Sequence, residues 1–147
     1  MTTALPVWYL MRASGVVALL LLTLSLSLGI ATSNRWRPRG SALYVTTTVH
    51  RNASLLAVVF IGVHILTAVI DSDAAVSLAS ALIPIGPGIW LALGALSFDL
   101  VAAIVVTSLI RNRLPYRLWR AIHWAAYASW PFAIWHGIGM GSDAATW

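Results

Sequence analysis

The sequence contains no cysteine and no lysine, and charged residues make up only 9% of its 147 positions. Without cysteine the chain cannot form disulfides, hold an iron–sulfur cluster through thiolates or attach a c-type haem covalently. Any redox cofactor must therefore be held by nitrogen, oxygen or thioether ligands. Because a soluble domain keeps roughly a quarter of its residues charged, this chain has too little charge to cover a water-facing surface.

What the chain has instead is a 60% share of hydrophobic residues and a mean hydropathy of +0.86. A helix needs about 20 apolar residues to cross the hydrocarbon core, and lipid requires each span to be helical. Four runs qualify: about Trp8–Ile30, Leu43–Ile70, Gly88–Ile110 and Leu118–Met140. We therefore expect an all-α fold, a polytopic transmembrane bundle of four spanning helices that forms a single domain over residues 1–147.

The distribution of charge predicts how these spans are oriented. All nine basic residues are arginines, and eight lie beside the predicted spans: Arg35, Arg37, Arg39, Arg51, Arg111, Arg113, Arg117 and Arg120. The opposite side carries Asp71, Asp73 and Asp143. The positive-inside rule places the arginine loops in the cytoplasm and both termini outside. This pattern indicates a multi-pass protein of the cell membrane, as in a bacterial inner membrane, rather than a nucleic-acid partner.

A cleaved signal peptide ending near Ala31 is the alternative interpretation of the first run. It is disfavoured because no basic residue precedes Arg12, and because cleavage would leave the arginines of residues 35–39 outside.

The four histidines all lie within predicted spans, two on the second and two on the fourth. These two spans run in the same direction because one span separates them. At 1.5 Å per residue, His50 and His123 each lie about 10 Å to the cytoplasmic side of the midplane, and His64 and His136 about as far to the outer side. We call these pairs the inner level and the outer level; they are separated by about 20 Å.

One imidazole from each helix at each level is the arrangement needed to ligate two irons. Two axial histidines leave no open coordination position, which favours electron transfer over substrate binding. Fourteen residues separate His50 from His64, which places both on nearly the same helix face, but the thirteen from His123 to His136 leave these two about 140° apart. A change in winding is therefore required, and Pro131 is a candidate cause. Polar contacts between helices, or another metal or proton path, are the alternatives.

The segments VHRNASLLAVVFIGVHIL and AIHWAAYASWPFAIWHGIG resemble the ferric reductase-like transmembrane domain. That family includes ferric reductases, NADPH oxidases and the haem subunit of the periplasmic methionine sulfoxide reductase system. The resemblance implies two b-type haems with histidine ligands on both sides, the inner held by His50 and His123 and the outer by His64 and His136. The family's intramembrane arginine resembles Arg12, within YLMRASGVVALLL.

The resemblance also implies an oxidoreductase component that carries electrons outward, from a cytoplasmic flavoprotein or a quinol to an extracytoplasmic protein or metal ion. The sequence departs from the family pattern in having four predicted spans where five or six are common. It has no flavin or nicotinamide domain, and Ala68 stands where NADPH oxidases carry a further histidine. The competing hypothesis is a haem-free small transporter or assembly subunit that uses the histidines for metal or proton transit.

Haem propionates need cationic partners. Arg12 lies at the outer level, whereas Arg51 and Arg120 lie beside the inner-level histidines, so these three arginines are candidate cofactor-binding residues. Four glycines fall at depths where a flat macrocycle approaches the backbone: Gly15, Gly62, Gly94 and Gly137. Asp99, midway along the third span, is interpreted as a protonated contact to a Ser or Thr of another helix, with orientation of a ligand imidazole or a proton relay as the alternatives. Met140 is interpreted as facing lipid or the interface rather than as a thioether ligand.

Overall fold

A computed structural model describes residues 4–33, 43–71, 74, 76–85 and 88–141, and within these ranges the chain is helical with no strand. The helices are α1 (Ala4–Ser33), α2 (Leu43–Ile70), α3 (Leu78–Leu82), α4 (Ile89–Leu109), the short 3-10 helix η1 (Arg111–Arg113), α5 (Tyr116–His123) and α6 (Ala126–Gly139). Several residues used to predict topology lie outside the described ranges: Arg35, Arg37, Arg39, Asp73 and Asp143. The all-α prediction is confirmed for the described residues.

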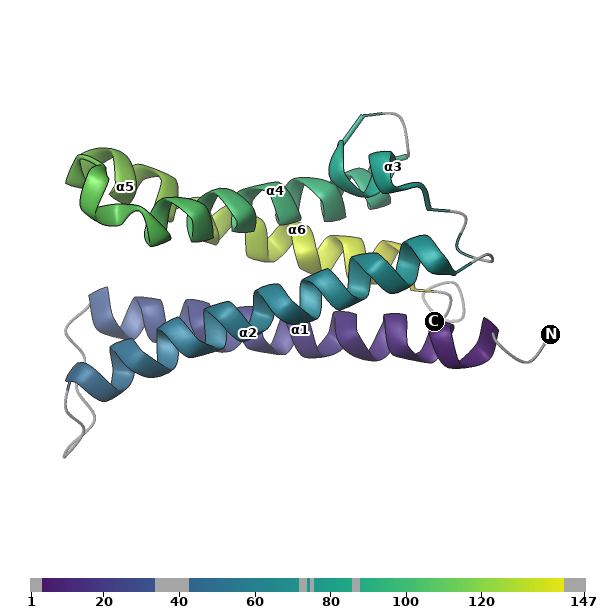
Figure 1. The fold of residues 1–147 in the computed structure, drawn as a ribbon, viewed down its shortest axis with the longest axis horizontal. Helices are drawn as coiled ribbons and strands as arrows, with labels where there is room; N and C mark the ends of the chain where they lie inside the picture. Colours follow the sequence, from purple (N-terminus) through teal and green to yellow (C-terminus); the bar gives the residue numbers. More distant parts are fainter. Residues whose placement is uncertain (1–3, 34–42, 72–73, 75, 86–87, 142–147) are drawn as a thin grey trace.

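The long helices form two antiparallel hairpins, α1 with α2 and α4 with α6, which are laid side by side (Figure 1). Packing is extensive within each hairpin, whereas α1 touches α6 and α2 touches α4 much less. The start of α1, the end of α2, the short α3 and the end of α6 share one end of the bundle. The start of α2 and α5 share the other end, so α2 and α6 run in the same direction, as predicted.

Three helices are long and apolar enough to cross a membrane: Leu5–Ser33, Tyr44–Ile70 and Ile89–Leu109. Their bounds agree with the first three predicted spans to within a few residues. The fourth predicted span is divided between α5 and α6, and neither of these helices is long enough to cross alone. Four spans with both termini outside therefore remain a prediction.

The division between α5 and α6 supplies the change in winding that the histidine spacing requires. The backbone N–H groups of Ala125, Tyr127 and Ala128 each bond the carbonyl three residues earlier, at 2.9, 3.1 and 3.0 Å. This 3-10 pattern turns the chain about 20° further per residue than an α-helix does. The tight winding therefore lies just before Pro131, which has no N–H to donate to the carbonyl of Tyr127, and α6 continues through that proline. Pro131 remains the candidate cause that the sequence suggested.

Small side chains fill the interior of the bundle. The buried apolar residues among those described are five alanines and Val101, and no large side chain is fully buried. Buried serines join the helices of the second hairpin, where the Ser97 hydroxyl donates to the Ser129 carbonyl at 2.8 Å. Trp130 Nε1 donates to Thr23 Oγ1 at 2.9 Å and ties α6 to α1 across the two hairpins. Large apolar side chains instead cover the outside, as a lipid-facing surface requires.

Candidate functional site

The four histidines meet in two pairs between the hairpins, one from α2 and one from the α5–α6 segment in each pair. The ring centroids of His50 and His123 are 6.2 Å apart, and those of His64 and His136 are 6.1 Å apart. The ring planes cross at 67° and 81° respectively. The two-level pairing drawn from the sequence is thus the pairing in the structure.

Three of the four imidazoles are anchored by a backbone carbonyl of a neighbouring helix. His64 Nδ1 donates to the Met11 carbonyl at 2.8 Å, and His50 Nδ1 donates to the Ser25 carbonyl at 2.8 Å. His136 Nδ1 donates to the Trp90 carbonyl at 2.9 Å. Because a carbonyl only accepts, Nδ1 must carry the proton in each ring. In the neutral form of each of these three imidazoles, Nε2 is therefore the nitrogen left to ligate a metal.

His123 is held differently. Its Nδ1 is buried and has no hydrogen-bond partner among the described residues. The ring stacks instead on Trp119, with centroids 4.9 Å apart and planes inclined by 26°. Trp119 is fixed in turn by the Arg111 guanidinium, 4.2 Å from the centre of its ring, and by a 3.3 Å hydrogen bond to Ser108 Oγ.

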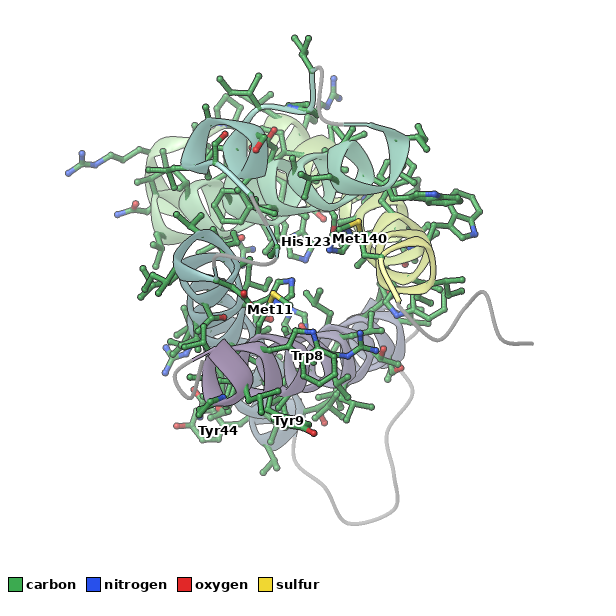
Figure 2. The ribbon with its side chains drawn as sticks, turned by 90° about the vertical axis from the view of Figure 1, so that its right-hand side faces the viewer. Trp8, Tyr9, Met11, Tyr44, His123 and Met140 are labelled. Atoms are coloured by element: carbon green, nitrogen blue, oxygen red, sulfur yellow. The ribbon has the colours of Figure 1, made fainter. Side chains whose placement is uncertain are left out.

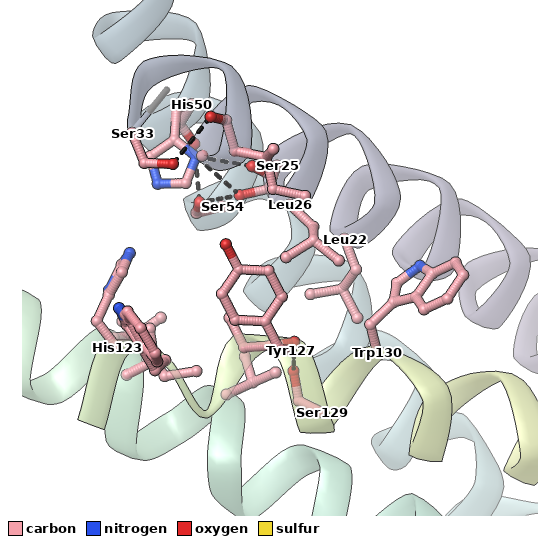
Figure 3. A pocket seen from close by; sticks show the side chains of 17 residues that line it. Leu22, Ser25, Leu26, Ser33, His50, Ser54, His123, Tyr127, Ser129 and Trp130 are labelled. Carbon is pink, nitrogen blue, oxygen red and sulfur yellow. Dashed lines mark hydrogen bonds between the residues drawn. The ribbon is translucent and has the colours of Figure 1, made fainter. Parts of the chain in front are cut away.

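A cavity of about 150 Å³ lies at the inner level and is lined by both His50 and His123. Its wall near His50 is polar, because the Ser25 hydroxyl lies 2.5 Å from that of Ser54 and 3.3 Å from His50 Nδ1. Most of the remaining wall is apolar. Tyr127 points across the cavity from the His123 side toward these serines (Figure 3). The cavity thus offers two imidazoles, hydroxyl groups and an apolar enclosure.

The three candidate arginines occupy different surroundings. Arg12 is half-buried one turn after Trp8, with its guanidinium 4.9 Å from the ring centre, and directly follows the residue whose carbonyl anchors His64. Arg51 and Arg120 are exposed, and the Arg120 guanidinium lies 5.5 Å from the ring centre of Trp124. Of the three, Arg12 is the best placed toward a site inside the bundle.

Two methionines lie at the outer end of the bundle. Figure 2 shows the side chains of Met11 and Met140 turned inward between the hairpins, whereas Tyr9 and Tyr44 point away from the bundle. Met140 is 48% exposed, so it sits at the mouth of the outer level rather than facing only lipid.

Asp99 is half-buried on α4 and makes no hydrogen bond or ion pair with any described residue. The interhelical contact expected for it is instead made by Ser97, two residues earlier.

Sequence reasoning missed the side chains that support the histidines. Trp119, Ser25, Ser54 and Gly29 were not singled out as candidate site residues. A signal for Gly29 was present, because Gly15 and Gly29 are fourteen residues apart, like His50 and His64. Gly62 and Gly137, which were also singled out from the sequence, have no protein atom within 4 Å of the position that a Cβ would take.

A family model for the ferric reductase like transmembrane component matches residues 14–134. The chain belongs to the ferric reductase-like transmembrane family. The matched range contains three of the histidines and covers most of α1 through most of α6. No curated protein and no solved structure matches the chain. The family and the three apolar helices identify a membrane protein, and ferric reductase-like transmembrane domains serve transmembrane electron transfer and generally bind haem.

The residues of this family member fit that cofactor. A metal–imidazole bond is about 2 Å long, so two imidazoles on opposite sides of one metal have centroids about 6 Å apart; the two pairs are separated by 6.2 and 6.1 Å. No group of three or more metal-ligating side chains occurs in the part of the chain that the structure describes. Two imidazoles per level suit a porphyrin iron, which takes only axial ligands from the protein.

Proposed function

We propose that this protein carries electrons across a membrane through two b-type haems. His50 and His123 would hold the inner haem, and His64 and His136 the outer haem. The observation that carries the proposal is the pairing of imidazoles at two depths, with centroids at 6.2 and 6.1 Å. The hydrogen bonds from Nδ1 of His50, His64 and His136 to backbone carbonyls support the proposal further, because they leave Nε2 of each ring as the possible ligand.

The proposal includes a fourth span made by α5 and α6 together. Support comes from the packing of α6 along α4 and of α5 against α4, which continues the second hairpin over the length of the bundle (Figure 1). With four spans the whole chain is one di-haem domain, the arginine loops face the cytoplasm and both termini face outside.

The chain's own residues hold and insulate the cofactor. When bound, haem iron supplies a reversible one-electron carrier at each level. Carbonyls of α1 and α4 orient three of the ligand imidazoles and fix their tautomer, and the ring of Trp119 orients His123 by stacking on it. Arg12 would pair with the propionates of the outer haem, and Arg51 and Arg120 with those of the inner haem.

The direction and partners follow from the proposed orientation. A cytoplasmic flavoprotein or a membrane quinol would donate electrons at the inner level, beside the exposed arginines of η1 and α5. An extracytoplasmic protein or metal ion would accept them at the outer level, which lies at the end shared by α3 and the last turn of α6.

The absence of cysteine makes the orientation directly testable. Single-cysteine variants at exposed positions, Ile85→Cys at the α3 end and Arg113→Cys in η1, are expected to label from opposite sides of the membrane. A membrane-impermeant maleimide added to intact cells should modify the first and leave the second until the cells are opened. The cysteine-free wild type is the control. Labelling of both from one side would contradict the four-span orientation.

Electron transfer is tested in proteoliposomes with ferricyanide trapped inside and an impermeant reductant outside. Haem-loaded protein should bleach the internal ferricyanide, whereas vesicles with the His64→Ala/His136→Ala variant should bleach no faster than empty vesicles. Equal rates for the loaded wild type and empty vesicles would contradict the proposed function.

A further inference from the structure

Each anchored imidazole lies against a glycine one helical turn after the residue whose carbonyl it binds. The three carbonyl–glycine pairs are Met11 with Gly15, Ser25 with Gly29, and Trp90 with Gly94. Within a helix, residues four apart lie above one another on one face. Each pair therefore forms a notch, in which the absent side chain lets the imidazole reach the carbonyl.

The room in these notches is small. A Cβ at Gly94 would lie 2.5 Å from His136 Nδ1, and one at Gly15 would lie 2.9 Å from His64 Nδ1. Neither distance is compatible with the present ring position, so a side chain must push the ring off its carbonyl. At Gly29 the nearest atom, His50 Cε1, is 3.4 Å away, so the inner-level notch is looser.

The spacing of the notches repeats that of the histidines. Gly15 and Gly29 are fourteen residues apart on α1, and His64 and His50 are fourteen apart on the antiparallel α2. His123 lies thirteen residues before His136, and this segment runs antiparallel to α4. A notch for His123 would therefore lie thirteen residues after Trp90 and Gly94 on α4, at Ala103 and Thr107. Thr107 is not a glycine, and its hydroxyl donates to the Ala103 carbonyl at 2.6 Å. The position of the fourth notch is filled, which agrees with the unpartnered Nδ1 of His123.

We infer that Gly15, Gly29 and Gly94 are positioning residues that set the ligand geometry of the haems, and that the two levels are held unequally. The inference rests on the proposed function. At the outer level both imidazoles bind a backbone carbonyl and pack against a glycine. At the inner level only His50 does so, and His123 is held by stacking on Trp119. The notch glycines thus control the outer haem more strictly than the inner one.

The test uses Gly94→Ala and Gly15→Ala, with Val106→Ala and Val16→Ala as controls. The controls change a side chain on the same two helices, α4 and α1, at positions that are 55% and 59% exposed. Haem per chain and the low-spin ferric electron paramagnetic resonance (EPR) signals are measured in the purified proteins. The signal of each level is assigned from its own histidine variants.

Gly94→Ala and Gly15→Ala should each shift or abolish the outer-level signal and leave the inner-level signal unchanged. Val106→Ala and Val16→Ala should retain both signals, and Gly29→Ala should disturb only the inner one, less strongly. Adding Gly94→Ala to His136→Ala should cause no further loss, because the ring that the glycine positions is gone.

Unchanged signals in both Gly94→Ala and Gly15→Ala would overturn the inference, as would equal loss of both levels, which indicates general destabilisation. If one of these variants fails to fold, the other tests the same level from the opposite hairpin. A wild type without haem would instead overturn the proposed function itself, independently of the glycines.

Discussion

Replacing His64 with alanine is expected to remove the outer haem and leave the inner one, so that haem content falls by about half. The variant removes one of the two imidazoles proposed to hold that haem, and the imidazole of His136 alone would not complete the coordination. The inner pair is about 20 Å away along the helices and shares no ligand with it. Haem is measured as the pyridine haemochrome per chain, and the EPR signal that disappears identifies the level.

The control is Leu66→Ala, two residues later on α2, where the side chain is 59% exposed and faces away from the histidine pair. It should keep the full haem content. If His64→Ala retained all of its haem, or lost both haems in folded protein, the assignment of this residue to one level would be wrong.

Double substitutions are expected to show which histidines share an iron. His64→Ala/His136→Ala should lose no more haem than either single variant, because both residues serve one level. His50→Ala/His64→Ala should lose nearly all haem, because it damages both levels. The strong non-additivity in the first case follows from residues that act as a unit.

The same comparison separates the proposed pairing from a crossed one. If His50 instead shared an iron with His136, His50→Ala/His136→Ala would keep one haem, whereas the structure predicts that it keeps none. Centroid distances of 6.2 and 6.1 Å within the pairs are the basis for this expectation.

The apolar runs were enough to locate the first three long helices, because lipid leaves a helix as the only way to satisfy the backbone there. The depths of the histidines were equally predictable, because the rise per residue in a helix is fixed. Pairing within each level then followed from the parallel directions of α2 and α6. These features depend on period and length, which the sequence states directly.

The features that position the ligands were harder to predict. Every residue carries a carbonyl, so nothing in the identity of Met11 or Trp90 marks it as an acceptor for an imidazole. Pro131 marked the region of the tight turn, but no residue type marks Ala125 and Ala128 as the positions whose N–H groups bond three residues back. Trp119 lies four residues before His123 on α5, so their stacking follows from the helical spacing, whereas the contacts of Trp119 with Arg111 and Ser108 depend on how the chain turns between α4 and α5.

The central claim is that each facing pair of imidazoles ligates one iron, and EPR of the oxidised wild type tests it most directly. We expect two low-spin ferric signals, both highly anisotropic, because the ring planes cross at 67° and 81° rather than lying parallel. A protein that purifies without haem, or whose haem gives a high-spin signal with an open coordination position, would contradict it.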